Sequence, residues 1–299
     1  MLAFPLGVLT AWGWIGGSKG AVQTVASAAP QSQHLAATPA DALHEPREVR
    51  PEPSLLARPL GAQALALGVR RVVLDPGHGG ENLGTSSAGG LLEKELTLDL
   101  STRVRQLLVK KGIEVVLTRT DDDTLSLKER AAVANERRGD IFVSIHLNSL
   151  QPSTLRGVET YYLGPSERPE HDAIAAKENE DSGYSLADMR TLLDSIYADA
   201  RREESKRLAE SVQDSVVRRL RGVDPQIKDR GVKMAPFIVL VATEMPAILA
   251  EVACLSNPAE GERLRTSAYR QTIAEALAAG IQTFIDQKHP GERKGHRES

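Results

Sequence analysis

Short apolar segments alternate with helical patterns from about residue 70 to residue 288, and this alternation constrains the fold more than any other feature of the chain. The predicted strands are the apolar runs at residues 72–74, 113–117, 141–145, 158–163, 238–241 and 248–252. Apolar side chains recur at helical spacing in residues 93–111, 127–138 and 268–287. Strands that alternate with helices are typical of an α/β domain. We therefore predict one domain over residues 70–288, with a mostly parallel, twisted sheet of about six strands and helices on both faces.

One region departs from this alternation. No strand is predicted from residue 164 to about residue 221, where two helical runs meet near residues 181–183. The second run is longer than the crossover between two parallel strands requires. We therefore predict a helical insertion over residues 164–205.

The two ends of the chain have a different composition. Residues 2–14 are almost wholly apolar but too few to span a bilayer, and Ala26-Ser27-Ala28 fits a signal peptidase site, although basic residues before the apolar run are missing. We predict a signal-peptide-like segment over residues 1–29, export to the periplasm or cell envelope, and no stable membrane span. Residues 30–69 are rich in Ala and Pro and form a predicted disordered linker, and residues 289–299 form a predicted polar tail.

Charge and cysteine content exclude several classes of protein. A formal net charge of -3 argues against a basic nucleic-acid-binding surface, and 4% aromatic residues argue against an aromatic platform for bases or sugars. Cys254 is the only cysteine, so the chain forms no internal disulfide and no cysteine-based zinc site.

Polar side chains gather at the predicted carboxyl ends of the strands, where open α/β sheets bind ligands. Among seven histidines only His78 and His146 occupy such ends, and Glu251 lies at the end of the last strand. Glu93 begins a helix fifteen residues after His78. Two imidazoles, a carboxylate and an open position are the pattern of catalytic zinc. Taken singly, a strand-end histidine is more often structural, and a glutamate in the first helical turn is favoured by the helix dipole.

Other chemistry is less consistent with the sequence. The glycines around His78 would suit a phosphate cradle, but no Walker motif and no G-x-G-x-x-G pattern follows. Cys254 could act as a nucleophile with His78 or His146, yet its apolar surroundings favour an inert buried thiol.

Seven ordered motifs between Arg71 and Ile285 resemble the zinc-dependent N-acetylmuramoyl-L-alanine amidases of the Amidase_3 family. They are "VVLDPGHGG", "GLLEKELTLDLS", "GIEVVLTRTDD", "SLKERAAVAN", "DIFVSIHLNS", "RGVKMAPFIVL" and "MPAILAEVACLSNP". The last motif departs from the family's pattern at Ala253 and Cys254, where a glycine and an aromatic residue are more usual. This departure concerns the local packing around Ala253 and Cys254 and does not change the residue at position 251.

The resemblance implies one zinc ion per chain, held by His78, Glu93 and His146, with Glu251 as the catalytic acid/base. The substrate it implies is peptidoglycan, cut at the amide between N-acetylmuramic acid and L-alanine of the stem peptide. Asp75 and Asn148 are candidates for orienting the ligands, although ordinary strand-end hydrogen bonding explains them equally well.

The predicted insertion resembles the regulatory helices of division-associated amidases, in which a helix donates a carboxylate to the zinc until an activator protein moves it. Glu178 is the better candidate for this carboxylate and Glu180 the second. An exposed acidic helix face would have the same sequence.

Two other functions remain open on the sequence. One is a catalytically silent wall-binding or regulatory protein on the same fold, which the presence of all four site residues disfavours. The other is a different zinc amidohydrolase, such as a peptidase or a deacetylase.

Overall fold

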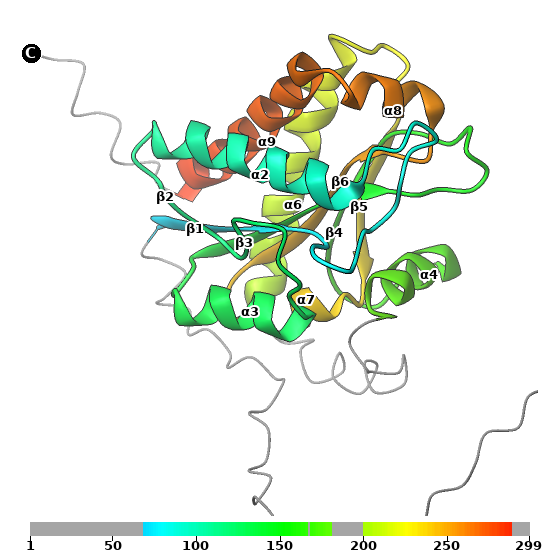
Figure 1. The fold of residues 1–299 in the computed structure, drawn as a ribbon. Coiled ribbons are helices and arrows are strands. Elements are labelled where there is room, and N and C mark those ends of the chain that lie inside the picture. Colours follow the sequence, from blue (N-terminus) through cyan, green and yellow to red (C-terminus); the bar gives the residue numbers. More distant parts are fainter. Residues whose placement is uncertain (1–67, 167, 181–199, 289–299) are drawn as a thin grey trace, which may run out of the picture. The chain divides into compact units, whose positions relative to one another are not determined.

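A six-stranded sheet forms the centre of the structure, a computed structural model that describes residues 68–166, 168–180 and 200–288 (Figure 1). The sheet order is β2-β1-β3-β6-β4-β5. The strands are β1 (Arg71–Pro76), β2 (Glu114–Leu117), β3 (Ile141–Asn148), β4 (Val158–Leu163), β5 (Asp229–Ala235) and β6 (Ala247–Cys254). Neighbouring strands are parallel except β4 and β6, which are antiparallel. The predicted fold class, with about six mostly parallel strands, is confirmed.

Helices cover both faces of the sheet, and each face has its own apolar cluster (Figure 1). The helices α2 (Glu93–Val109), α6 (Ala200–Arg221) and α9 (Ser267–Lys288) pack on one face. The other face carries α3 (Leu127–Glu136), α4 (Pro169–Glu178) and α7 (Ile238–Val241), while α8 (Pro258–Leu264) follows β6. The face covered by α3, α4 and α7 also holds the polar residues described below.

The prediction that residues 238–241 form a strand is wrong, because they form the short helix α7. The sixth strand is instead β5, whose sequence DRGVKMA contains three charged residues and a glycine. A four-residue apolar run does not distinguish a buried strand from a buried helical turn. An edge strand such as β5 buries little of its surface, so it needs few apolar residues.

The reversed direction of β4 and β5 determines which residues meet at the edge of the sheet. Their first residues lie at the edge where β1, β3 and β6 end, and Glu159 near the start of β4 is paired with Glu251 of β6. The same edge therefore combines the carboxyl ends of three strands with the amino ends of two others.

Several sequence predictions concern residues outside the described ranges. These are the signal-peptide-like segment at residues 1–29, nearly all of the linker at residues 30–69 and the tail at residues 289–299. The predicted insertion at residues 164–205 contains α4 and the first residues of α6, with residues 181–199 outside the described set. None of the helices in the described ranges has the length and apolar character needed to cross a membrane.

Helix α3 begins with a capping box, as expected for a helix that follows Ser126. The Ser126 hydroxyl accepts a hydrogen bond from the Glu129 backbone N–H, and the Glu129 carboxylate accepts one from the Ser126 backbone N–H. These bonds satisfy backbone donors that the first turn of a helix leaves free. Because α3 carries Arg130, the cap also supports the polar edge of the sheet.

We predict that Ser126→Ala lowers the free energy of unfolding by about 1 kcal/mol, because it removes the cap acceptor. Ser126→Asp supplies an equivalent acceptor and should keep most of this stability. Urea denaturation of the three proteins measures both effects. Equal losses in the Ala and Asp variants would contradict a capping role for Ser126.

Candidate active site

The chain turns sharply after β1, and two buried arginines hold the turn. His78 has a left-handed backbone with φ of 58°, a conformation that is uncommon for residues other than glycine. Arg130 donates to the carbonyl oxygens of Pro76 and His78 at 2.7 and 2.6 Å. Arg119 donates to the carbonyl oxygens of Pro76 and Gly77 at 3.1 and 2.9 Å. These bonds offset the strain of the turn and fix the direction in which the His78 side chain points.

Asp75 stands behind this turn, and its hydrogen bonds go to residues other than His78. Its carboxylate accepts hydrogen bonds from Thr118, Ser144 and Arg130 at 2.6, 2.7 and 2.9 Å. Burial raises the pKa of this carboxyl, but Arg130 and the two hydroxyls outweigh burial and hold the pKa below its usual range. Asp75 therefore acts on the turn through Arg130.

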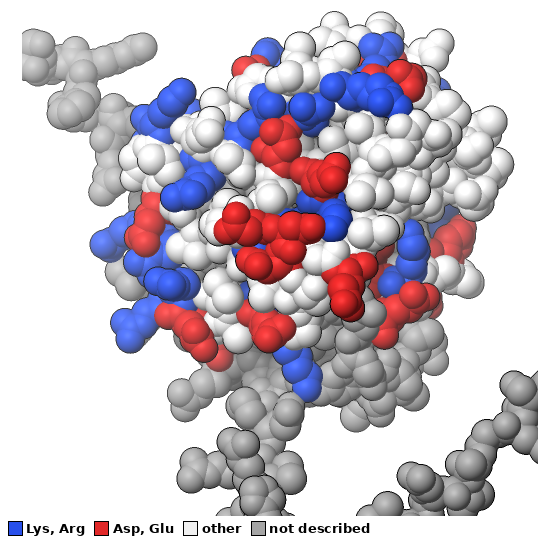
Figure 2. All heavy atoms as spheres, viewed as in Figure 1, with Lys and Arg blue, Asp and Glu red and all other residues white. Residues whose placement is uncertain are grey.

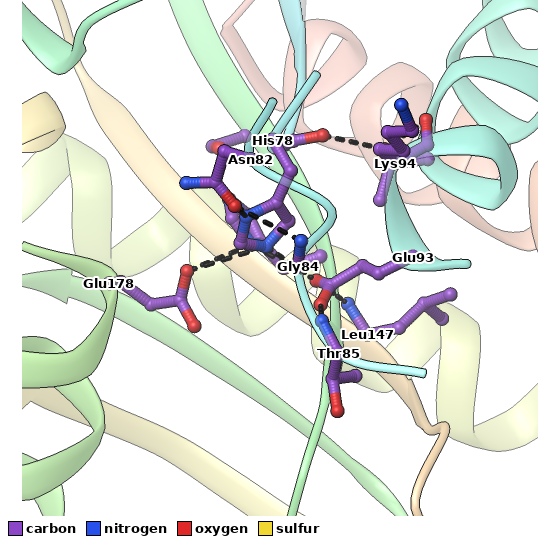
Figure 3. A network of polar contacts seen from close by, with 12 residues as sticks. His78, Asn82, Gly84, Thr85, Glu93, Lys94, Leu147 and Glu178 are labelled. Atoms are coloured by element: carbon purple, nitrogen blue, oxygen red, sulfur yellow. Dashed lines mark hydrogen bonds and ion pairs between the residues drawn. The ribbon is translucent and has the colours of Figure 1, made fainter. Parts of the chain in front are cut away.

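Two imidazoles and one carboxylate meet at the edge of the sheet (Figure 3). Glu93 Oε1 lies 3.1 Å from His78 Nε2 and 3.2 Å from His146 Nδ1. Both nitrogens are buried and form no hydrogen bond with any described residue. Two buried nitrogens without hydrogen-bond partners, directed at one carboxylate oxygen, are what an absent cation would leave.

Glu93 comes from the far face of the sheet and is held by backbone donors. It begins α2, and its two carboxylate oxygens accept hydrogen bonds from Leu147 N–H at 2.9 Å and Thr85 N–H at 2.8 Å (Figure 3). These bonds orient the carboxylate toward both histidines. The site therefore joins the start of a helix to the ends of two strands.

Neighbouring residues fix the ring of His78 and leave room for the site. His78 Nδ1 lies 2.9 Å from Asn82 Oδ1, so the imidazole donates there and Nε2 presents its lone pair to Glu93. A Cβ at Gly77 would lie 2.5 Å from the His146 ring, and a Cβ at Gly84 would lie 2.5 Å from the His78 ring. Both positions therefore require glycine.

The charges of the site influence one another strongly. Burial raises the pKa of Glu93, but the adjacent imidazoles dominate and hold the pKa far below its usual range, so the carboxylate is ionised. Burial lowers the pKa of His78, yet the carboxylates of Glu93 and Glu178 outweigh burial and raise it. The protein thus presents a negative, acceptor-rich position that attracts a cation or a proton.

Helix α4 supplies a further carboxylate. Glu178 Oε2 lies 3.5 Å from both His78 Nε2 and His146 Nδ1, and Figure 3 shows its carboxylate pointing toward His78. Asn179, directly after α4, bonds to Pro236 O and Ile238 N–H at 2.9 Å each and so fixes this end of the helix. The remaining cavity beside the site measures only about 30 Å³.

The spacing of these atoms is compatible with a zinc site. Bonds of about 2.0–2.1 Å to zinc correspond to ligand–ligand distances of roughly 3.3–3.4 Å in a tetrahedron. The four histidine–glutamate distances within this group are 3.1 and 3.2 Å to Glu93 and 3.5 Å twice to Glu178. Two imidazole nitrogens and a carboxylate oxygen at this spacing are donors that suit Zn²⁺.

Glu251 lies beside this cluster, paired with His146 across β3 and β6. Its Oε2 is buried and has no hydrogen-bond partner in the described ranges. A carboxylate oxygen of Glu251 lies within 4.8 Å of ligand atoms of His146 and Glu178. Burial, followed by the negative charges of Glu93, Glu178 and Glu159, raises the pKa of Glu251 well above its usual range. A carboxyl group whose affinity for a proton is raised in this way is suited to proton transfer.

Other residues considered from the sequence lie in different surroundings. Asn148 donates to Glu159 at 2.5 Å instead of orienting a histidine. Cys254 is fully buried with its Sγ 3.3 Å from Ser256 Oγ. Glu180 is exposed, in contrast to Glu178.

The loop after β1 does not offer a phosphate cradle. The backbone N–H groups of Gly77, Gly79 and Gly80 already donate to Ile145 O, Asn82 O and Asp122 Oδ1 at 2.8–3.1 Å. A phosphate site of this type needs free N–H groups.

Sequence reasoning missed the residues that support the site from behind. Asn82, Arg119, Arg130 and Glu159 were not singled out. Arg119 follows a predicted strand, whereas the other three lie in a loop, in a helix and near the start of a strand. A buried arginine within an otherwise apolar helical face, as at position 130, is the one signal that the sequence offered, since arginine is rarely buried without a partner.

Charge on the visible surface is mixed. Figure 2 shows acidic and basic side chains interspersed over this face, with acidic groups gathered near its centre. This face, as far as the described residues form it, has no continuous basic patch of the kind that binds nucleic acid.

Comparisons with known proteins agree with the geometry. The Amidase_3 family, described as N-acetylmuramoyl-L-alanine amidase, matches residues 72–283. The chain is 31% identical over 225 residues to the N-acetylmuramoyl-L-alanine amidase AmiA of Escherichia coli K12, covering 73% of this chain and 77% of AmiA.

Solved structures show the same relationship. The N-acetylmuramoyl-L-alanine amidase of Clostridium difficile 630 is 32% identical with a TM-score of 0.57, covering 74% of this chain and 99% of that one. The CwlD amidase of Clostridioides difficile, solved in complex with the GerS lipoprotein, is 26% identical with a TM-score of 0.56, covering 73% and 99%.

We predict that Asp75→Asn destabilises the protein by roughly 3–5 kcal/mol at neutral pH, because it leaves Arg130 buried without its counter-charge. The pKa of Asp75 is lowered in the folded protein, so its contribution is present above the unfolded pKa of about 3.9 and is lost as the pH falls through the folded value. The stability difference between wild type and variant should therefore shrink below about pH 4.

Asp99→Asn is the matched control, because Asp99 forms partly exposed ion pairs with Arg103 and Arg270 and should change stability by no more than about 1 kcal/mol. Denaturant titrations from pH 7 to pH 2.5 measure both variants. A difference for Asp75→Asn that stays constant with pH would contradict the assignment.

Proposed function

The chain belongs to the Amidase_3 family of N-acetylmuramoyl-L-alanine amidases and is a peptidoglycan amidase, and on this premise we propose how its residues perform the cleavage. His78, Glu93 and His146 hold one Zn²⁺ ion, and Glu251 is the catalytic acid/base. The bond that is cut joins the lactyl group of N-acetylmuramic acid to L-alanine of the stem peptide. The observation that supports this proposal best is the approach of two unpartnered imidazole nitrogens to Glu93 Oε1.

Zinc bound here would supply Lewis acidity, which polarises an amide carbonyl and makes water a usable nucleophile near neutral pH. The remaining chemistry belongs to the side chains. Asn82 fixes the tautomer of His78, and the backbone donors of Thr85 and Leu147 fix Glu93. The ligands are thus oriented before substrate binds.

Glu251 transfers the proton. Its carboxylate accepts a proton from the attacking water and delivers it to the nitrogen of the departing L-alanine, which must leave as a neutral amine. The withdrawal of Glu178 removes one of the negative charges that raise the pKa of Glu251. Its carboxyl then loses a proton more easily and becomes the base that the first step needs.

Glu178 on α4 blocks the site. Its carboxylate occupies the fourth position around the cluster, and the cavity of about 30 Å³ that remains admits no sugar or peptide. The enzyme is therefore autoinhibited until α4 moves. Glu178 is assigned this role rather than Glu180, because Glu178 faces the two histidines and Glu180 is exposed.

The proposed block requires a partner that moves α4. The CwlD amidase of Clostridioides difficile, solved in complex with the GerS lipoprotein, shows that a relative binds a second protein. We propose an activator that acts on residues 164–205 here, and a role in cell division. Peptidoglycan lies outside the cytoplasm, and the signal-peptide-like residues 1–29 support export to the periplasm or cell envelope.

We predict that Glu251→Gln lowers kcat on purified peptidoglycan by about 10²–10⁴-fold, because the amide neither accepts nor donates the proton that this step transfers. Zinc content, measured by atomic absorption, should stay at one per chain. Glu262→Gln, on the exposed surface, is the control and should keep full activity.

Mass spectrometry of the products separates the candidate reactions. Free lactyl ends identify an amidase, and free sugar amines identify a deacetylase. Wild-type rates in Glu251→Gln would rule out its catalytic role, and binding of peptidoglycan without any product in zinc-loaded Glu178→Ala would favour the silent wall-binding protein.

We predict that Glu178→Ala raises the basal rate at least tenfold, because it removes the carboxylate from the fourth position while leaving the zinc ligands intact. Glu180→Ala, two residues away and exposed, should leave the basal rate unchanged. Dye-release assays on peptidoglycan compare the two variants. If both retain the wild-type rate while folding is intact by circular dichroism, Glu178 does not block the site.

A further inference from the structure

A row of charged side chains crosses the sheet beyond the catalytic cluster. His146 of β3 is paired with Glu251 of β6, Glu251 is paired with Glu159 of β4, and Arg230 of β5 binds Glu159. Neighbouring strands are roughly 4.8 Å apart, so this row extends about 14 Å from His146 to β5. It begins at the proposed zinc ligands and ends at an arginine that the mechanism does not use.

Glu159 holds that arginine in place. The Glu159 side chain is fully buried, and its Oε1 accepts hydrogen bonds from Asn148 Nδ2 and Tyr161 OH. Its Oε2 accepts from Arg230 Nε at 2.6 Å and from Lys233 Nζ at 2.5 Å. Because a single bond through Nε engages one edge of the guanidinium, its plane is fixed while the Nη groups stay available.

The outer end of Arg230 has unused binding capacity. Its side chain is 26% exposed, and its Nη groups form no hydrogen bond or ion pair with any residue in the described ranges. One carboxylate is matched with two cations, so Glu159, Arg230 and Lys233 carry a net charge of +1. This arrangement attracts one more anion, and a planar fork with free Nη groups is suited to a carboxylate.

We propose that Arg230, oriented by Glu159, binds a carboxylate of the substrate's peptide, two or three residues beyond the bond that is cut. This inference rests on the proposed function, because it places the scissile amide at His78, Glu93 and His146. An extended peptide advances roughly 3.4 Å per residue, so its second or third residue lies within the row and the reach of Arg230. The stem peptide thus crosses β6 and β4 toward β5, and the glycan lies on the side of β1.

Helix α4 packs beside the proposed path of the peptide as well as beside the proposed zinc site. His171 of α4 packs edge-on against Tyr161 of β4, with ring centres 6.0 Å apart, and Tyr161 also binds Glu159. Movement of α4 therefore uncovers the path of the peptide at the same time as it withdraws Glu178.

A purely structural role for Arg230 would lead to a different experimental result. If Arg230 serves only to neutralise Glu159, its loss reduces stability but does not alter the choice between substrates. The free Nη groups favour recognition, because a buried carboxylate that already accepts from Asn148, Tyr161 and Lys233 does not need a fourth donor with an exposed end.

The test uses two synthetic N-acetylmuramoyl peptides that differ in one group. The residue after L-alanine carries a free carboxylate in the first and a primary amide in the second. Initial rates are measured by chromatography with the zinc-loaded, full-length protein carrying Glu178→Ala, which removes the proposed block; in this test, wild type means this protein with Arg230 unchanged. We expect wild type to favour the carboxylate substrate by on the order of ten- to a hundredfold in kcat/KM, the range for a charge-assisted pair.

Arg230→Gln should abolish this preference by raising KM for the carboxylate substrate alone, with kcat and the rate on the amide substrate retained. Arg230→Lys keeps the positive charge but lacks the planar guanidinium group, so it should restore part of the preference for the carboxylate substrate. Arg219→Gln is the control, because Arg219 is exposed on α6 and pairs with Glu275; it should behave as wild type.

The outcomes separate this inference from the proposed function. If wild type hydrolyses both peptides equally well, or Arg230→Gln keeps the full preference, the carboxylate site is contradicted while the amidase mechanism stands. If the zinc-loaded Glu178→Ala protein, in which the proposed block is removed, hydrolyses neither peptide even after prolonged incubation, the proposed function itself is contradicted, and this inference fails with it.

Discussion

The position of one carboxylate oxygen, Glu93 Oε1, between two imidazole nitrogens is the contact on which the rest of this site depends. Glu93 starts a helix on one face of the sheet, while His146 lies in β3 and His78 lies in the turn that follows β1. To meet, they need the strained turn at His78, two glycines that leave space and two arginines that hold the turn. The surrounding structure therefore keeps one carboxylate oxygen and two imidazole nitrogens close together without hydrogen bonds between them.

The change of strand direction between β6 and β4 explains the wider layout. If β4 ran parallel to β6, the neighbour of Glu251 would lie near the carboxyl end of β4. Here it is paired with Glu159 near the beginning of β4, so two buried carboxylates stand side by side. Glu159 is neutralised by Arg230 and Lys233, whereas Glu251 has no such partner. The two pKa values are accordingly displaced in opposite directions, with Glu159 held ionised and Glu251 able to hold a proton.

The sequence was sufficient to predict the strands with a clear apolar pattern and the residues at their carboxyl ends. It placed His78, His146 and Glu251 at one edge, because strands such as β3 and β6 are long apolar runs. It missed β5, a charged edge strand, and with it the reversal that places Glu159 and Arg230 at the same edge. It favoured Glu178 over Glu180 but could not decide between them, because the point at which α4 ends, just before Glu180, is not fixed by the sequence pattern.

The central claim is that His78, Glu93, His146 and Glu178 together hold one zinc ion. A crystal of the full-length protein loaded with zinc, measured on both sides of the zinc absorption edge, tests it most directly. We expect a single anomalous peak with four ligand atoms at about 2.0–2.2 Å, one from each residue. A peak elsewhere, no peak, or a zinc ion with the Glu178 carboxylate turned away would contradict the account.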